Sequence, residues 1–466
     1  MARGNMYFKH RMLAVIISGI FISGSALARP LEEELRQLST EHPLIKSARK
    51  SVESSDYGRD VARAGFLPKL SISGDTGKEK ISSTSHQAVN NKIDSSSKSL
   101  LPQKSDLNRE KFVTLIEQNL FSGGRTMALV GIAEIDFAAQ ENAFRSTMQN
   151  VLLEGITAYL QVGRYKTLIA IAARNEATTQ KQLNLEDERV KRGGGIAVDV
   201  LQAKTRLQIA KERRVFQEQN LRDAVAQYRQ VFGHAPDLDK IQDLDILIGQ
   251  LPTSLEEALE VSQELNPSLK EAVLQSQKAM KQIGTERAGF MPSIDLVGLQ
   301  SNDKNANQLA EREETSLLVK MNWNLFAGGE TIGRYRASAA NHESLVEREI
   351  NVARKVEEAV RIAWNQLVNG RERQDLLANA ADISFEVMHN RQRLRDAGKE
   401  TAINVLDSEV EYYGVQANRF NAIYDTRIGS YRLLAAMGQL TPKLVGMEEA
   451  KIALPVKPFE VKFDVK

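Results

Sequence analysis

The feature that most constrains this chain is an internal repeat that runs through most of its length. The stretch "AGFLPKLSISG" at 64–74 returns as "AGFMPSIDLVG" at 288–298, an offset of 224 residues. The phrase "NLFSGG" at 119–124 returns as "NLFAGG" at 324–329, an offset of 205 residues. Motifs that recur in the same order indicate a duplicated set of secondary-structure elements. The fold must therefore be built from two similar halves.

The difference between the two offsets locates an insertion. "VDVLQA" at 198–203 and "INVLDS" at 403–408 keep the offset of 205, so the first half holds 19 extra residues between Gly74 and Phe112. This segment is rich in Ser, Lys and Asn. Such a composition predicts a long exposed loop.

The start of the chain has the pattern of an export signal. Arg3, Lys9 and Arg11 lead into a short apolar run, and Ala26 and Ala28 supply the small residues of a cleavage site. This pattern predicts a signal peptide that ends at Ala28, with a retained N-terminal anchor as the alternative. The expected organisation is a signal peptide at 1–28, a first repeat at 29–248, a second repeat at 249–440 and a tail at 441–466.

Each half is expected to hold a helical segment, two strands and two longer helical runs. The first helical segments lie at about 31–63 and 254–286. Strands are predicted because apolar and polar residues alternate with a period of two, which places the apolar ones on one face. In the second half that face would hold Leu317, Val319, Met321, Trp323 and Leu325. A soluble hairpin packed on a core would show the same alternation as a membrane hairpin.

A very long helix is predicted after each repeated phrase. No proline occurs from Arg125 to Gly193, and one helix over this stretch would reach about 100 Å. Steps of three and four residues indicate a coiled-coil seam, so the helix must pack laterally on others. The seam is expected at Leu152, Ile156, Tyr159, Ala170, Ala173 and Ala177. An ordinary coiled coil or spectrin-like bundle is the alternative.

Composition excludes several functions. The 62 basic and 60 acidic residues nearly balance, which gives no electrostatic basis for binding nucleic acid. The chain has no cysteine, and its six histidines are scattered without the spacing of metal ligands. Neither a phosphate-binding loop nor a nucleophile elbow is present. We therefore expect no enzyme, no cofactor and no metal site.

Over residues 31–440 the chain resembles the TolC-like outer-membrane efflux protein family, and two repeated motifs carry this resemblance. They are the strand-to-helix phrase "LFxGG" and the later pattern "Gly … (Asp/Asn)-Val-Leu-x-(Ala/Ser)". The resemblance implies a mixed, mainly α fold with duplicated long coiled-coil hairpins that form an α-barrel. It also implies four transmembrane β-strands per chain, which close a twelve-stranded barrel in a homotrimer.

The same resemblance implies a role and partners. It implies an exit duct that spans the outer membrane, extends into the periplasm, and docks onto a periplasmic adaptor and an inner-membrane ABC or proton-driven transporter. The missing cysteine after the signal favours type I protein secretion, because many drug-pump ducts of the family are lipid-anchored there. The alternatives are a multidrug or metal efflux channel and a non-transport periplasmic coiled-coil protein.

Three sets of site residues follow from the motifs. Glycine tolerates backbone angles that other residues resist, so the paired glycines of the repeated phrase are expected to form the strand-to-helix joints. These joints are Gly123, Gly124, Gly328 and Gly329. By resemblance, adaptor docking is expected at the hairpin tips, through Gly193, Gly195, Val200, Leu201, Gly398, Val405 and Leu406. By resemblance, a periplasmic gate is expected at Asp407, Asn404 and Asp199. Arg395 precedes the second tip and is expected to belong to the gate by bridging neighbouring hairpins through a carboxylate in the closed state.

Overall fold

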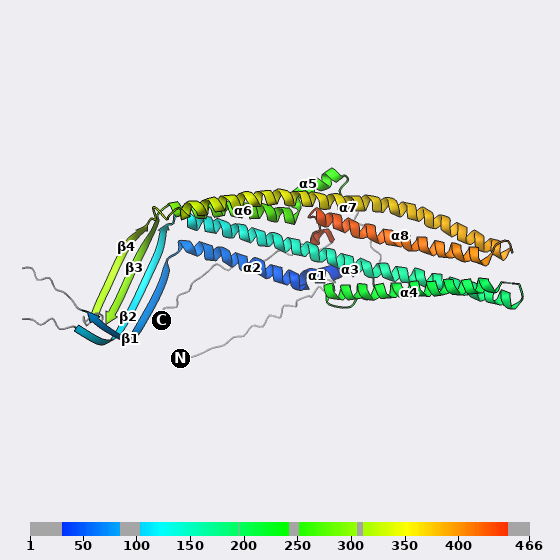
Figure 1. Cartoon of the computed structure of the whole chain (residues 1–466), viewed down its shortest axis with the longest axis horizontal. Helices are drawn as coiled ribbons and strands as arrows, with labels where there is room; N and C mark the ends of the chain where they lie inside the picture. Colours follow the sequence, from blue (N-terminus) through cyan, green and yellow to red (C-terminus); the bar gives the residue numbers. More distant parts are fainter. Residues whose placement is uncertain (1–29, 84–102, 195, 242–250, 305–310, 446–466) are drawn as a thin grey trace, which may run out of the picture.

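A computed structural model describes residues 30–83, 103–194, 196–241, 251–304 and 311–445. The molecule is elongated, with a small sheet at one end and long helices that run from it to two hairpin tips at the other (Figure 1). The predicted signal peptide at 1–28, the tip residue Gly195 and the tail beyond residue 445 lie outside the described residues.

The two halves contain the same elements in the same order. The first half comprises α1 (Pro30–Glu41), α2 (Pro43–Arg63), the 3-10 turn η1 (Ala64–Phe66), β1 (Lys69–Ser83), β2 (Gln103–Phe121), α3 (Arg125–Lys191) and α4 (Ala197–Phe232). The second half comprises α5 (Leu255–Leu265), α6 (Pro267–Arg287), η3 (Ala288–Phe290), β3 (Ser293–Lys304), β4 (Glu311–Asn322), α7 (Glu330–Asp396) and α8 (Ala402–Ala436), followed by η4 (Pro442–Val445). The mainly helical fold with four strands is confirmed.

The first helical segment of each half, predicted at about 31–63 and 254–286, consists of two helices separated by a break. The breaks fall before Pro43 and Pro267, where the preceding residue is forced out of the helical region. Each preceding side chain caps the next helix: His42 Nδ1 accepts from the Leu44 amide at 3.3 Å, and Asn266 Oδ1 accepts from the Ser268 amide at 2.9 Å. Proline at the first helical turn and a polar cap together start α2 and α6.

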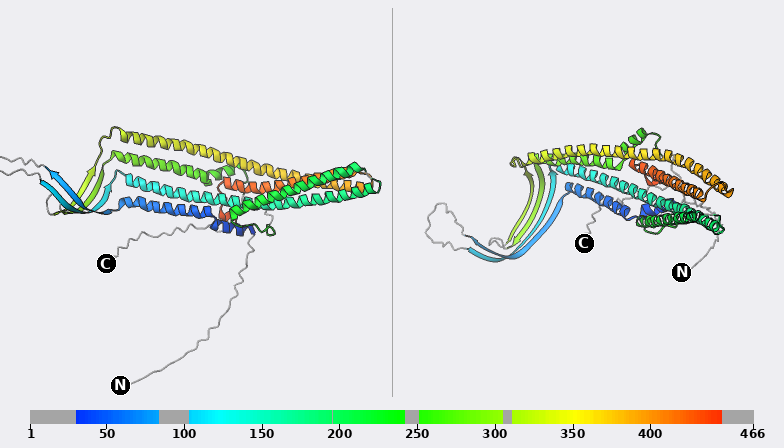
Figure 2. Two further views of the ribbon diagram at one scale, coloured as in Figure 1. Left: turned by 60° about the horizontal axis from the view of Figure 1, so that its bottom comes forward. Right: turned by 45° about the vertical axis from the view of Figure 1, so that its right-hand side comes forward.

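The long helices α3 and α7 form the length of the molecule. Each has 67 residues and therefore spans about 100 Å. Two shorter helices pack one after the other along each long helix. These are α2 and α4 along α3, and α6 and α8 along α7 (Figure 2). The largest apolar core lies where α1, α3, α4 and α8 meet, and its fully buried members include Leu35, Leu152, Ile156 and Tyr228.

The predicted seam of α3 is correct only in its first part. Leu152, Ile156 and Tyr159 are buried, whereas Ala170, Ala173 and Ala177 are exposed in the chain. The buried positions continue instead through Leu168, Ala172, Asn175, Thr179, Gln182 and Glu186. Hydrophobicity indicated the wrong face because the true seam becomes polar toward the tip.

The four strands form one antiparallel sheet in the order β1-β2-β3-β4. The central pair β2–β3 joins the two halves, with Ile116 opposite Gly298, while β1 and β4 lie at the edges. One face is apolar and exposed through Leu70, Ile72, Phe112, Ile116, Leu317, Val319 and Met321. β4 ends at Asn322, so Trp323 and Leu325 lie just beyond the strand.

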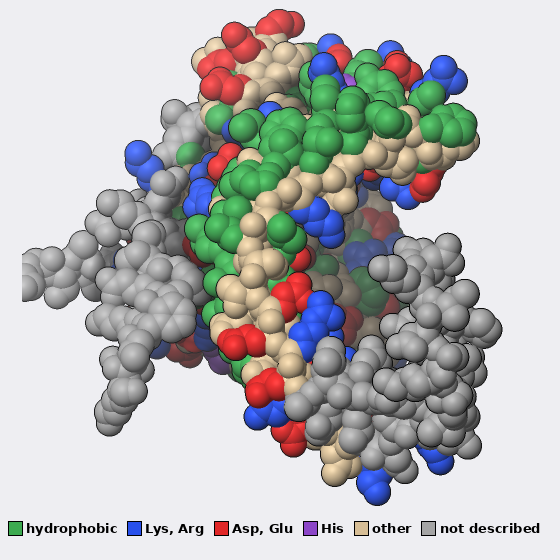
Figure 3. Space-filling model, turned by 90° about the vertical axis from the view of Figure 1, so that its left-hand side faces the viewer, with side chains coloured by type: hydrophobic (Ala, Val, Ile, Leu, Met, Phe, Trp, Pro, Cys, Tyr) green, Lys and Arg blue, Asp and Glu red, His purple; other side chains and the backbone are tan. Residues whose placement is uncertain are grey.

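Figure 3 looks onto the strand end of the molecule and shows a band of hydrophobic side chains that gives way to charged ones. The strand pairing explains the boundary: on the apolar face, Glu110 lies two residues before Phe112, and Thr315 and Glu313 precede Leu317. Among the described helices, none carries an apolar stretch long enough for a membrane span.

The insertion in the first half extends its hairpin, which corrects part of the predicted loop. Gly74 pairs with Phe112, and Gly298 pairs with Leu317, so the same register holds in both hairpins. β1 continues to Ser83, and β2 begins at Gln103, so both strands run further from this pair than β3 and β4 do. The residues between them, 84–102, lie outside the described part of the chain.

Candidate functional site

The strand-to-helix joints have the same backbone geometry in both halves. Gly123 and Gly124 have φ of 64° and 89°, and Gly328 and Gly329 have φ of 61° and 88°. The second glycine of each pair is the residue just before the long helix. These left-handed angles are costly for side chains with a Cβ, so the joint requires glycine in this conformation.

A hydrogen bond that sequence reasoning missed fastens each joint to the short turn before the first strand. Gln118 Nε2 donates to the Phe66 carbonyl at 2.7 Å, and Trp323 Nε1 donates to the Phe290 carbonyl at 3.1 Å. The donors Gln118 and Trp323 occupy equivalent positions of the two repeats at the offset of 205 residues. The acceptors Phe66 and Phe290 are equivalent at the offset of 224 residues. Only a comparison of the two registers could have found this contact, because Gln and Trp share nothing but a side-chain N–H donor.

The first tip exposes apolar side chains. Gly193, with φ of 77°, ends the turn after α3, and α4 begins at Ala197. Ile196, Val198 and Leu201 are 65%, 55% and 62% exposed. Of the predicted docking residues here, Leu201 faces solvent, whereas Val200 is buried in a small core shared by α3, α4 and α8.

The second tip buries Leu406, the residue equivalent to Leu201. Gly398 has φ of 74°, and α8 starts with Thr401 as its cap, whose Oγ1 accepts from the Asn404 amide at 3.4 Å. Val405 and Leu406 are buried, and Leu406 belongs to the core of the first tip. The two tips therefore differ in surface chemistry although their sequences match.

Asn404 and Asp407 take different roles in the structure. Asn404 Nδ2 donates to Glu400 Oε1 at 2.6 Å, and this hydrogen bond is the main reason that the pKa of Glu400 is lowered. Asp407 is exposed and forms an ion pair with Arg206 of α4 at 2.6 Å. Asp199 lies half-buried in the first turn of α4. Of the predicted gate carboxylates, Asp407 is thus the exposed one.

Arg395 lies inside the bundle rather than at its mouth. Its guanidinium donates to Glu186 and Gln182 of α3, and only 8% of the residue is exposed. The sequence suggested a bridging role for Arg395 but identified neither these partners nor the neighbouring Glu409. The 205-residue register could not indicate them, because it aligns Arg395 with Val190 and Glu409 with Lys204.

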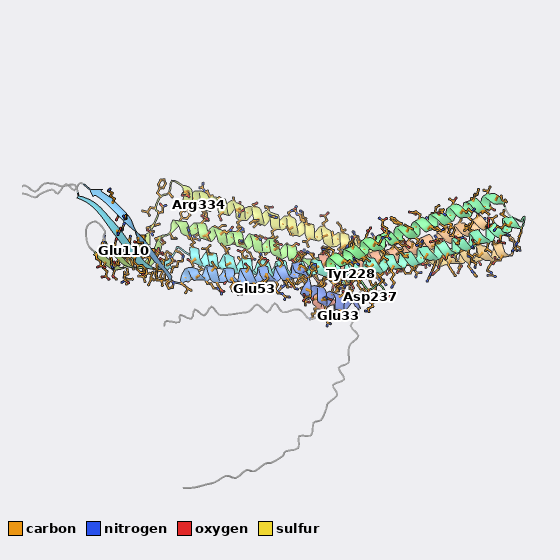
Figure 4. All side chains as sticks on the ribbon, turned by 90° about the horizontal axis from the view of Figure 1, so that it is seen from below. Glu33, Glu53, Glu110, Tyr228, Asp237 and Arg334 are labelled. Carbon is orange, nitrogen blue, oxygen red and sulfur yellow. The ribbon has the colours of Figure 1, made fainter. Side chains whose placement is uncertain are left out.

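A separate polar contact lies midway along the molecule. Glu34 Oε2 of α1 and His234 Nε2 at the end of α4 are 3.0 Å apart. Burial, with the charge of Glu34 second, raises the pKa of the adjacent Tyr228. Figure 4 places Tyr228 and Asp237 in this middle region, away from Glu110 in the sheet. No cluster of metal-ligating side chains occurs within the described ranges.

Comparison with known proteins gives one consistent family. The model of the outer membrane efflux protein family matches residues 35–234 and 258–439. Outer membrane efflux protein BepC of Brucella suis is 24% identical, with 94% of this chain and 92% of that protein covered. Alkaline protease secretion protein AprF of Pseudomonas aeruginosa is 21% identical, with 82% and 79% covered.

A solved structure supports the fold. The Campylobacter jejuni CmeC outer membrane channel superposes with a TM-score of 0.74 at 14% identity, over 90% of this chain and 87% of that one. At this identity the likeness concerns the arrangement of helices and strands. The long hairpins and the small sheet are therefore an arrangement that an outer-membrane channel also adopts.

Proposed function

This chain belongs to the outer membrane efflux protein family, and we propose that it is the exit duct of a tripartite export machine that serves type I protein secretion. It is an outer-membrane protein that extends into the periplasm. The observation that carries the duct is the sheet: one face is apolar and exposed, and among the described residues both edge strands lack a pairing partner on their outer side. Neither feature suits a periplasmic protein that stands alone.

The open edges support a homotrimer. In lipid, unpaired N–H and C=O groups of β1 and β4 have no water to bond, so the sheet has to close. Three copies of this four-stranded sheet would form one closed barrel of twelve strands, with the apolar face toward lipid. The trimer would be recovered from outer-membrane fractions as a heat-modifiable band. Recovery only as soluble protein would overturn the duct.

We propose that the adaptor docks at the tips and that the first tip supplies the apolar contact. Ile196, Val198 and Leu201 form an exposed apolar surface there. Val200, Val405 and Leu406 support it from beneath, because they are packed inside. Gly193 and Gly398 contribute the turns themselves, whereas the predicted docking residue Gly195 lies outside the described residues. Leu201→Ser should weaken capture of the adaptor, whereas Glu411→Ser, on an exposed position of α8, should leave it unchanged.

The gate proposal concerns Asp407, with Asn404 and Asp199 nearby. Three copies of an exposed Asp407 near the mouth would form an acidic ring, and each would be paired with Arg206 in the closed state. Such an exposed pair contributes little stability, so it can break when the mouth opens. Single-channel recording of Asp407→Ala should show higher conductance and weaker block by divalent cations. Unchanged conductance together with unchanged block would contradict the ring.

The cargo is the finer part of the proposal. AprF is named for alkaline protease secretion, which supports a polypeptide cargo, whereas BepC is named as an efflux protein, which favours a small-molecule pump as the second candidate. Deleting the gene in its natural host separates them. Loss of one or more secreted proteins, with unchanged tolerance of dyes and solvents, would support secretion. The reverse pattern would support the pump.

A further inference from the structure

The seam between the two hairpins becomes polar close to the tips. Asn175, Thr179, Gln182 and Glu186 occupy successive buried positions of α3, spaced by four, three and four residues. That spacing normally carries the apolar residues of a coiled coil. Burying polar groups is costly unless each is hydrogen-bonded, yet Asn175 Oδ1 and Thr179 Oγ1 have no partner among the described residues.

Glu409 of α8 lies at the centre of this polar seam. It is 0% exposed. Its Oε1 accepts from Gln182 Nε2 of α3 and from Gln392 Nε2 of α7, both at 2.8 Å. Its Oε2 is buried and has no hydrogen-bond partner within the described residues. One carboxyl oxygen thus joins three helices, while the other is left unsatisfied.

The charges around Glu409 do not balance when it is ionised. Arg395 of α7 is its nearest buried cation, but this guanidinium already donates to Glu186 and Gln182 of α3. Lys181 of α3 adds only a weaker attraction. On the α4 side, Arg206 is partly exposed and already paired with Asp407. An ionised Glu409 would therefore place a second carboxylate beside a single guanidinium in a buried site, which is unfavourable.

The direction of titration follows from these surroundings. Burial raises the pKa of the Glu409 carboxyl, and the hydrogen bonds from Gln182 and Gln392 offset part of that rise. A carboxyl whose pKa is raised by packing stabilises the packed state fully below its ordinary pKa. That contribution is lost as the pH rises through the raised pKa. Acidic conditions thus favour the packed seam.

We propose that Glu409 is a proton-controlled latch between the two hairpins of one chain. Neutral Glu409 keeps α7 and α8 packed on α3, and its ionisation loosens the seam beside the tips. The consequence for export rests on the proposed function, whereas the movement itself can be measured without transport. A proton is the only ligand that the latch requires.

The absence of cysteine makes the test direct, because labels attach only where cysteine is introduced. Spin labels at Asn184→Cys and Glu411→Cys, on exposed positions of α3 and α8, report the separation of the hairpins. Labelled chains are diluted into unlabelled ones, so that the measured distances are intrachain. In detergent, the full-length protein should show one short distance at pH 5 and a longer, broader distribution at pH 8.

Variants connect the movement to Glu409. Glu409→Gln keeps the shape but cannot ionise, so its distance should stay short at both pH values, while Glu409→Asp should keep a pH response. Glu386→Gln is the matched control: it makes the same change at an exposed position of α7 and should respond like wild type. A wild-type distance that ignores pH, or a Glu409→Gln variant that still responds, would overturn the latch. Either result would leave the duct proposal standing, since outer-membrane trimers are assayed separately.

Discussion

At the scale of single residues, the two joints show one motif set in two different surroundings. Gly123 and Gly328 share a left-handed backbone, yet their neighbours differ. A Cβ built on Gly123 would lie 2.7 Å from Met291 Cβ and 2.8 Å from the Ala288 carbonyl. A Cβ on Gly328 would meet nothing within 4 Å. In the first joint, glycine therefore serves close packing as well as backbone conformation.

This difference predicts unequal effects of alanine. Gly328→Ala should cost the left-handed conformation alone, about 1–2 kcal/mol. Gly123→Ala should cost that amount plus a clash with the backbone around Ala288, which cannot rotate away as a side chain could. On heating, the heat-modifiable trimer band should be lost at a lower temperature for Gly123→Ala than for Gly328→Ala. Equal temperatures for the two variants would contradict the packing role.

At the scale of elements, sequence reasoning found the helices and strands but not all their faces. The absence of proline predicted α3 to within a few residues. The seam beyond Tyr159 was misplaced, because its buried members from Asn175 to Glu186 are polar and leave no hydrophobic signal. The extension of β1 beyond Gly74 was missed for a similar reason: backbone pairing, not a buried side-chain face, makes those residues a strand.

The candidate site shows the same limit. The turn glycines were predictable because positive φ has a sequence signature, and Gly193 and Gly398 adopt it. Burial at the tips was not predictable, since equivalent positions in the two repeats, Leu201 and Leu406, face opposite environments. Which of two matching leucines is exposed depends on how the hairpins pack on each other, and no local pattern encodes that packing.

Two glycines inside α7 give a matched test of helix packing. A Cβ on Gly370 would lie 2.7 Å from Thr426 Oγ1 of α8, where the Thr426 hydroxyl already donates to the Ala422 carbonyl. A Cβ on Gly333 would meet nothing within 4 Å. Gly370→Ala should destabilise the protein by about 1–3 kcal/mol through overpacking. Gly333→Ala should stabilise it by about 0.5–1 kcal/mol, because alanine favours helix.

Thermal unfolding followed by far-ultraviolet circular dichroism would compare the two alanine variants with wild type. The helical signal should be lost at a lower temperature for Gly370→Ala and at a higher one for Gly333→Ala. A stabilised Gly370→Ala would show that α7 and α8 are not in close contact at this point.

At the scale of the whole molecule, a sheet with one apolar face is attached to a long helical bundle. Neighbouring residues of β4 illustrate the division, since Val319 lies on the apolar face and Leu318 on the opposite one. Both side chains are exposed in the single chain. Their environments would differ only after assembly in a membrane, where one face meets lipid and the other meets the lumen.

An arginine at each position tests this assignment. Val319→Arg should weaken insertion by about 2–4 kcal/mol, because the charge would enter the lipid-facing band. Leu318→Arg should assemble nearly as well as wild type, because the lumen is aqueous. Refolding into lipid vesicles, followed by the fraction of heat-modifiable trimer, measures both. Equal loss in both variants would reject the assigned faces.

The pairing of β2 with β3 also determines when the protein can fold. Each hairpin joins strands that are near in sequence, but the contact between Ile116 and Gly298 spans the entire first helical hairpin. Contacts between distant segments form late, because closing a long loop costs entropy before the contact repays it. The sheet therefore stays divided in two until the chain has been made and delivered at least as far as Lys304 of its 466 residues, and during that interval its apolar face needs protection from aggregation.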